Sequence, residues 1–186
     1  MIETLKFYKN FPKEGINFID IIPFLQSKKA FREVVEALKE ATHAPNVAAP
    51  EARAFLFTAP LLSEDGIVEN IIPMRKSGKL PFHDGDLQEV SIVKEYGCDK
   101  LFYRLSDIAA GVAEGDTFYI TILDDVLATG GTALGVAESL EKLTVYRDGK
   151  AYNVKVKEFI FLVEIDEING KERLEKIAPV KSLMHI

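Results

Sequence analysis

The chain has 186 residues, of which 47% are hydrophobic and 28% are charged, and its formal net charge is −6. A chain of this length buries roughly 70% of the surface that its unfolded form exposes, so it can build a core without disulfides or structural metal. Its single cysteine, Cys98, excludes an internal disulfide and a cysteine-rich zinc site, and it indicates a reducing compartment. The acidic balance argues against sequence-independent nucleic-acid binding, which needs many basic side chains opposite the phosphates. Any anion site must therefore be local.

The segment that begins at Met1 lacks the charged and apolar regions of a secretory signal. No stretch approaches the ~20 apolar residues that cross a bilayer. We therefore expect a cytoplasmic protein that binds no membrane. No repeat, low-complexity tract or long linker divides the sequence, so we expect a single domain over residues 1–186.

The first half of the chain contains one clear helical pattern and several short apolar runs. Apolar side chains at i, i+3, i+4 and i+7 predict a helix over residues 27–41; they are Phe31, Val34, Val35 and Leu38. A short apolar stretch at residues 47–49 precedes Pro50, and a helix-compatible segment follows up to Leu62. Residues 71–74 are expected to form a buried strand that leads into a basic loop.

The second half alternates strand and helix patterns. Proline, glycine and aspartate predict a loop over residues 80–88, with strands near 89–93 and 101–105. The β-branched and aromatic run at residues 117–123 predicts a strand that stops at Asp124. A Gly-Gly turn and a helical stripe follow; the stripe comprises Ala133, Val136, Ala137 and Leu140.

An Asp-Gly pair near the end of the chain predicts a hairpin. The pair is Asp148 and Gly149, and an apolar strand is expected over residues 159–163. We assign this hairpin no role in function. The alternation of strands and amphipathic helices indicates an α/β domain with a mainly parallel sheet, whose ligands lie at the carboxyl ends of the strands.

The strongest chemical signal follows the strand predicted at residues 117–123. Asp124 and Asp125 place two carboxylates at its end, where they can bind sugar hydroxyls or a divalent ion. The small residues 128–132 then open a helix, and their size lets a phosphate approach the backbone N–H groups of the first turn. Hydroxyls of Thr129 and Thr132 can add hydrogen bonds. The loop is neither a Walker A sequence nor a dinucleotide-binding glycine loop, so it indicates a phosphorylated sugar.

Several segments resemble one enzyme family. Residues 124–133, Asp-Asp-Val-Leu-Ala-Thr-Gly-Gly-Thr-Ala, resemble the phosphoribosyl pyrophosphate (PRPP) loop of type I phosphoribosyltransferases. Residues 11–21 and 50–55 resemble the Phe-Pro…Gly…Phe-Arg-Asp-Ile and Glu-Ala-Arg-Gly-Phe segments of the adenine phosphoribosyltransferase family. Further matches follow in the same order, at residues 75–81, 95–97, 162–164 and 169–172. The resemblance extends from about residue 11 to residue 174.

The resemblance implies a type I phosphoribosyltransferase fold, in which residues 1–25 and C-terminal pieces form a small hood over the sheet. It implies transfer of phosphoribose from PRPP to N9 of a purine, with adenine giving AMP and pyrophosphate in purine salvage. Magnesium is the implied cofactor, held mainly through substrate and water. A homodimer is also implied, because in the family the basic segment that matches residues 75–79 lies near a dimer interface.

The family's functional residues map onto this sequence as follows. The residues expected at the ribose are Asp124 and Asp125, which would anchor the hydroxyls and offset positive charge on the ring. The expected 5′-phosphate loop is Ala128, Thr129, Gly130, Gly131 and Thr132. The expected pyrophosphate-binding cations are Arg53, Arg75, Lys76 and Lys79. The base-binding segment is Asn17, Phe18 and Ile19; Glu95 would manage a proton on the purine, and Tyr96 would close over the substrates.

The sequence departs from the family at two places. Ile19 replaces an arginine beside the base, which leaves a 6-oxopurine open as an alternative substrate. Residues 49, 54 and 58 replace glycines near the pyrophosphate, which implies a reshaped turn or weaker binding; they are Ala49, Ala54 and Thr58. These losses also leave open a PRPP- or nucleotide-sensing regulatory protein. Arg53 on its own is equally explained by an ion pair with Glu51 or another nearby carboxylate.

Overall fold

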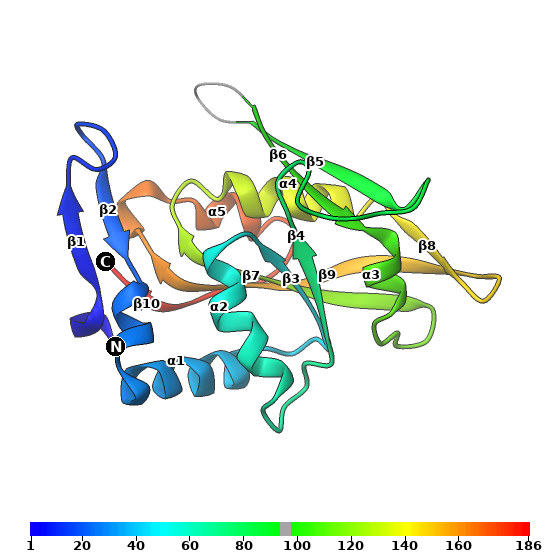
Figure 1. Ribbon diagram of the computed structural model, residues 1–186, viewed down its shortest axis with the longest axis horizontal. Coiled ribbons are helices and arrows are strands. Elements are labelled where there is room, and N and C mark those ends of the chain that lie inside the picture. Colours follow the sequence, from blue (N-terminus) through cyan, green and yellow to red (C-terminus); the bar gives the residue numbers. More distant parts are fainter. Residues whose placement is uncertain (94–97) are drawn as a thin grey trace.

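The structure, a computed structural model, describes residues 1–93 and 98–186. Its centre is a sheet with five parallel strands in the order β10-β9-β7-β3-β4, and β8 pairs antiparallel with β9 (Figure 1). The expected α/β architecture with a mainly parallel sheet is confirmed. The strands are β3 (Asn46–Pro50), β4 (Asn70–Met74), β7 (Thr117–Leu127), β8 (Thr144–Arg147), β9 (Lys150–Glu164) and β10 (Val180–His185).

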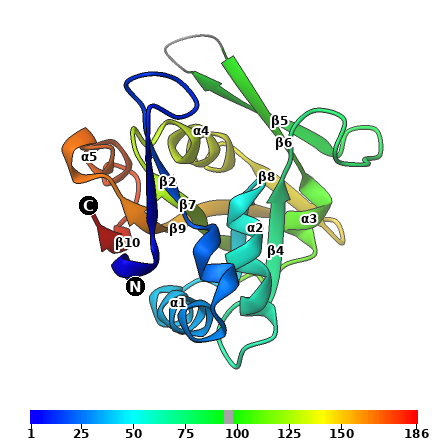
Figure 2. The same cartoon turned by 60° about the vertical axis from the view of Figure 1, so that its left-hand side comes forward.

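Helices cover both faces of this sheet, as Figure 2 shows for α1 (Lys28–Ala41) and α4 (Gly131–Leu140). Successive residues of a strand point to opposite faces, and the central strands are apolar on both. Ile122 of β7 therefore packs in the core cluster that contains α4. Its neighbour Leu123 packs in the second cluster, with α1. Two cores thus hold the carboxyl end of β7 in place.

Smaller elements surround the sheet. The antiparallel pairs are β1 (Lys6–Lys9) with β2 (Asn17–Asp20), and β5 (Leu87–Val93) with β6 (Cys98–Arg104). The short helices are α2 (Arg53–Thr58), α3 (Leu105–Ala109) and α5 (Lys171–Leu174). The 3-10 segments are η1 (Ile2–Thr4), η2 (Ile22–Gln26), η3 (Ala59–Leu62) and η4 (Asp166–Ile168). No helix among the described residues is long and apolar enough to cross a membrane.

The predicted helix over residues 27–41 is confirmed as α1, whose first turn is capped by Ser27. The Ser27 hydroxyl accepts a hydrogen bond from the Ala30 amide at 3.2 Å. The predicted hairpin at Asp148 and Gly149 is confirmed as β8–β9. The predicted end of the strand at residue 123 is wrong, because β7 continues to Leu127. Pairing with β9 continues to the end of β7, and this pairing outweighs the low strand propensity of aspartate.

Candidate active site

Asp124 and Asp125 lie near the carboxyl end of strand β7. The Asp125 side chain is only 8% exposed, and its Oδ2 lies 2.5 Å from Nε of Arg53 at the start of α2. The contact is an ion pair without hydrogen-bond alignment, since Oδ2 accepts no hydrogen bond from any residue that the structure describes. The Asp125 amide donates to Oδ1 of Asp124 at 2.9 Å. Burial, together with the adjacent charge of Asp125, raises the pKa of Asp124 well above its usual range.

A cavity of about 300 Å³ lies in front of this pair. Both aspartates line it, together with Thr132 at the start of α4. Its basic side chains come from three separate elements or loops: Arg53, Lys76 and Lys100. The lining also contains the carboxylates of Glu51 and Asp99, and Lys100 Nζ lies 2.8 Å from Glu89 Oε1 outside it. Guanidinium and ammonium groups suit a multivalent anion, which would bind here beside carboxylates that a divalent cation can neutralise.

Arg75 turns away from this cavity and pairs with Glu51. Its Nε donates to Glu51 Oε2 at 2.6 Å, and its guanidinium lies 5.7 Å from the centre of the Phe55 ring. Burial by itself would raise the pKa of Glu51, but hydrogen bonds from Arg75 and the Lys76 backbone, with their charges, lower it overall. Lys79 lies in an exposed turn and is not part of the cavity lining. Of the four predicted cations, Arg53 and Lys76 therefore face the cavity.

The predicted phosphate loop lines a smaller hollow of about 100 Å³, which Asp124 and Val126 share. Gly130 occupies the position before α4 with φ +71° and no side-chain cap. The first amides of a helix have no acceptors within the helix, and the residues that carry those of α4 line this hollow. A Cβ on Gly130 would lie 2.9 Å from the Gly170 carbonyl oxygen, and one on Gly170 would lie 2.0 Å from that of Ala128. The loop is thus pressed against the segment that precedes α5.

The predicted base-binding residues of β2 line a third cavity, of about 430 Å³. Arg53 also reaches it: its guanidinium lies 5.3 Å from the centre of the Phe18 ring, and Nη1 donates to the Ile19 carbonyl at 3.4 Å. The opposite wall comes from the segment after β9, through Ile165, Glu167 and Ile168. Arg53 therefore lines both this cavity and the one in front of Asp125.

Glu95 and Tyr96 lie outside the described residues. Ala49, Ala54 and Thr58 lie in β3 and α2, and all three are buried. The described residues other than glycine that have a positive φ are Asn10, Asp148 and Asn169, so none of the three adopts the conformation that favours glycine. The turn at residues 50–53, rather than these positions, lines the cavity.

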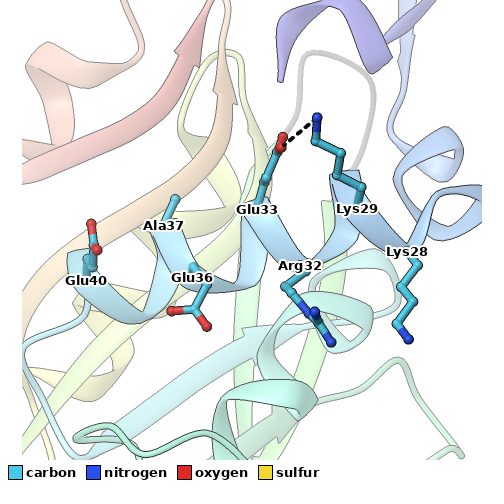
Figure 3. A pocket seen from close by; sticks show the side chains of 7 residues that line it. All are labelled: Lys28, Lys29, Arg32, Glu33, Glu36, Ala37 and Glu40. Atoms are coloured by element: carbon cyan, nitrogen blue, oxygen red, sulfur yellow. Dashed lines mark ion pairs between the residues drawn. The ribbon is translucent and has the colours of Figure 1, made fainter.

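A hollow of about 690 Å³ lies elsewhere, along the outer face of α1 (Figure 3). All of its lining residues belong to this one helix: Lys28, Lys29, Arg32, Glu33, Glu36, Ala37 and Glu40. It shares no residue with the three cavities at the carboxyl ends of the strands. We treat it as a depression between solvated side chains, despite its size, because it contains no converging reactive groups.

Among the described residues, a cluster of possible metal ligands includes the two residues that flank Ile165 of the third cavity. Atoms of Glu164, Asp166 and His185 are within 4.8 Å of one another. Their own contacts account for them: His185 Nδ1 lies 2.8 Å from Asp166 Oδ1, and the Ser182 hydroxyl donates to Glu164 Oε2 at 2.7 Å. We therefore assign no metal there.

Sequence reasoning did not assign Asp99, Lys100 or Glu167 to the site, and it considered Glu51 only as a partner of Arg53. Strand β6 carries Asp99 and Lys100 to the cavity, and Glu51 pairs instead with Arg75, 24 positions away in sequence. Glu167 lines the third cavity. The sequence could have drawn attention to Glu51, which lies in the quoted Glu-Ala-Arg segment, and to Glu167, which lies between two segments that match the family. Their positions in the site follow only from the fold.

Comparison with known proteins gives consistent matches over the full chain. An adenine phosphoribosyltransferase of Methanococcus maripaludis is 36% identical over 176 residues, which cover 93% of this chain and 91% of that protein. The crystal structure of the adenine phosphoribosyltransferase of Thermoanaerobacter pseudethanolicus matches with a TM-score of 0.80 and 35% identity, covering 100% of this chain and 97% of that one. No protein-family model matches the chain.

A third likeness is to a structure with ligands. The adenine phosphoribosyltransferase of Saccharomyces cerevisiae, complexed with D-2,5-dideoxy-2,5-imino-altritol 1,6-bisphosphate and adenine, matches with a TM-score of 0.77 and 30% identity. The match covers 98% of this chain and 95% of that one. The structural match that covers 100% of this chain thus includes the sheet and all three cavities.

Proposed function

The chain belongs to the adenine phosphoribosyltransferase family, and we propose on this basis that it makes AMP and pyrophosphate from adenine and PRPP. One observation carries the assignment of the site: Val126, directly after the aspartate pair, lines all three cavities. A purine, a pyrophosphate and a 5′-phosphate all radiate from one ribose. Three cavities that meet at one residue match that arrangement. The type I phosphoribosyltransferase fold, expected from the sequence, agrees with the solved relatives over the whole chain.

The reaction forms the bond between N9 of adenine and C1′ and breaks the bond between C1′ and the pyrophosphate oxygen. The electron pair of the broken bond leaves with pyrophosphate, and the proton of N9 is released. Positive charge develops on the ribose ring, as in glycosyl transfer generally. Asp124 and Asp125 hold the ribose hydroxyls in this proposal, and the carboxylate charge at Asp125 offsets the charge on the ring.

The cations of the cavity in front of Asp125 hold the leaving group. Arg53 and Lys76 line it, and a pyrophosphate would compete with Asp125 for Arg53. Arg75 instead positions Glu51 through their ion pair. Lys79, exposed and outside the cavity, serves the site of a second subunit in the homodimer that we propose.

The donor set of this cavity fits magnesium. Magnesium prefers hard oxygen ligands and keeps several waters, so one or two carboxylates beside substrate phosphates are sufficient. Asp124 and Asp125 offer carboxylate oxygens; Asp125 Oδ2 accepts no hydrogen bond from the described residues but lies in the ion pair with Arg53, which pyrophosphate would compete for. These two side chains would hold the ion through water and substrate. When bound, magnesium neutralises charge on the departing pyrophosphate.

The remaining assignments complete the proposal. Residues 128–132 bind the 5′-phosphate through backbone amides at the start of α4. Asn17, Phe18 and Ile19 hold the base, and the N-terminal hairpin with the segment after β9 acts as the hood. Glu95 manages the purine proton, and Tyr96 helps to exclude water. A cytoplasmic location is proposed because a single cysteine suits a reducing compartment.

One assay tests the function. The protein is incubated with PRPP and magnesium and with adenine, hypoxanthine, guanine or xanthine in turn, and nucleotide and pyrophosphate are measured. We expect equal amounts of AMP and pyrophosphate with adenine. Nucleotide from a 6-oxopurine alone would contradict the choice of base, and PRPP binding without turnover of any base would indicate a sensor instead.

A further inference from the structure

The phosphate loop is backed by residues 170–174, the segment that forms α5, which lies beside α4 (Figure 1). A Cβ on Gly170 would collide with the Ala128 carbonyl oxygen, so this oxygen points at Gly170. A Cβ on Gly130 would lie 3.4 Å from Cγ of the fully buried Leu174. None of residues 170–174 lines the hollow of the phosphate loop. The segment therefore supports the loop without forming part of the ligand cavity.

Arg173 of this segment bonds to the middle of the loop. Its Nη1 donates to the Thr129 carbonyl at 3.5 Å, a long hydrogen bond that the positive charge of the guanidinium strengthens. Among residues 1–93 and 98–186, no carboxylate oxygen lies within 4.0 Å of the Arg173 nitrogens. The guanidinium is therefore not drawn away from the loop by an ion pair with any of these residues.

These contacts fix the direction in which two amides of the loop point. The peptide bonds that follow Ala128 and Thr129 are trans, and in a trans peptide the C=O and the next N–H point in opposite directions. Both carbonyls are directed at residues 170–174, so the amides of Thr129 and Gly130 point away from that segment. Neither amide donates a hydrogen bond to another described residue, although Gly130 is buried. A buried amide without an acceptor is uncommon in proteins, and it suits an anionic oxygen.

We propose that Arg173 is a positioning residue for the 5′-phosphate of PRPP: its bond to the Thr129 carbonyl holds this peptide so that the Gly130 amide faces the phosphate. Rotation of the peptide would present the carbonyl oxygen instead, which repels an anion. Arg173 is not part of the hollow's lining, so it acts through the loop rather than on the ligand. A hydrogen bond of this kind changes affinity by about threefold to tenfold. The inference rests on the proposed function, which assigns the loop to the 5′-phosphate.

The test compares Arg173→Met, which removes the donor and the charge, with Arg173→Lys, which keeps both on a different group. Arg32→Met is the matched control, because Arg32 lies on the outer face of α1 and lines none of the three site cavities. Calorimetry gives Kd for AMP, which carries the 5′-phosphate, and for magnesium pyrophosphate, which does not. Steady-state kinetics give kcat and KM for PRPP, and melting temperatures establish that each variant is folded. The measurements are repeated at about 0.5 M salt, where the Debye length is about 4 Å.

For Arg173→Met we expect Kd for AMP and KM for PRPP to rise about threefold to tenfold relative to Arg32→Met, at both salt concentrations. The kcat and the Kd for magnesium pyrophosphate should not change, because the loop binds the 5′-phosphate equally before and during the reaction. Arg173→Lys should lie between Arg173→Met and the wild type.

If the wild type makes AMP and Arg173→Met matches Arg32→Met, the inference is overturned and the proposed function stands. A difference that vanishes at high salt would also overturn the inference, because the charge rather than the bond to Thr129 would then be responsible. Equal losses for AMP and magnesium pyrophosphate would overturn it too, since they would show a general defect in the fold. If the wild type neither binds AMP nor converts adenine, both the inference and the proposed function are overturned.

Discussion

Arg53 and Asp125 form an ion pair, with 2.5 Å between Nε and Oδ2, at the boundary between the base cavity and the pyrophosphate cavity. Arg53 also stacks on Phe18 and donates to the Ile19 carbonyl, so one side chain joins the base-binding strand to the ribose-binding strand. An incoming pyrophosphate must share or take this guanidinium. The ion pair therefore links the base cavity to the pyrophosphate cavity.

Arg53→Met tests that coupling. We expect kcat/KM for PRPP to fall about tenfold to a hundredfold, because one charge-assisted contact to the leaving group is lost. The buried Asp125 loses its partner, so the free energy of unfolding should also fall, by about 1–3 kcal/mol. Combining Arg53→Met with Asp125→Asn in a double-mutant cycle should give a non-zero coupling energy in urea unfolding. Additive effects of the two substitutions would show that the ion pair contributes nothing to stability.

Asp125→Asn tests the ribose-binding carboxylate. The substitution keeps the shape of the side chain but removes its charge, so turnover should fall by about a hundredfold to a thousandfold while the protein remains folded. Turnover is measured at saturating PRPP and adenine, and the fold by circular dichroism and thermal unfolding. Glu172→Gln is the control, since its carboxylate lies outside the cavities. Unchanged turnover would remove Asp125 from the mechanism.

Gly130→Ala tests the close approach of the phosphate loop to Gly170. Both the φ of +71° and the 2.9 Å between a Cβ and the Gly170 carbonyl oxygen oppose alanine here. Gly149, at φ +76° with nothing within 4 Å, provides a matched control for the backbone strain alone. We expect each alanine to cost about 1–3 kcal/mol of unfolding free energy, with the larger loss at Gly130.

Kinetics separate these two glycines further. KM for PRPP should rise in Gly130→Ala, because the loop must shift, and should not change in Gly149→Ala. Equal KM values in the two variants would mean that the loop position does not affect phosphate binding.

The sequence was sufficient to predict those elements whose determinants lie within a few turns of one another along the chain. The helix over residues 27–41 follows from the spacing of Val34 and Leu38 and from its Ser27 cap, all within a few turns. The extension of β7 through Asp124 and Asp125 was missed, because it depends on pairing with β9, more than thirty residues later in the chain. Short-range propensity contains no information about such a partner.

The site divides in the same way. The aspartate pair and the phosphate loop were predicted together because they are consecutive in sequence. The pairing of Arg75 with Glu51 and the shared cavity of Phe18 and Glu167 were not predicted, because each brings together segments that are distant in sequence and that only the fold makes neighbours. Arg75 was accordingly predicted to bind pyrophosphate, whereas its guanidinium lies against Glu51 and Phe55.

Glu51→Gln should remove a pH-dependent part of the stability. The pKa of Glu51 is lowered in the folded state from its ordinary value of 4.5: burial opposes this, but the contacts from Arg75 and the Lys76 backbone outweigh burial. Its ion pair therefore stabilises the fold fully above pH 4.5, and this contribution disappears as the pH falls through the lower, folded-state pKa. At neutral pH, Glu51→Gln should cost about 1–3 kcal/mol of unfolding free energy.

Urea unfolding of the wild type and Glu51→Gln over a pH series from neutral to below 4.5 measures this difference. It should narrow as the medium becomes more acidic, since protonated Glu51 resembles glutamine in charge. Arg75→Met should show the same narrowing, because it removes the other partner of the same pair. A difference between wild type and Glu51→Gln that stays constant through the acid range would contradict the lowered pKa, and would assign the cost of the substitution to packing around Phe55 instead.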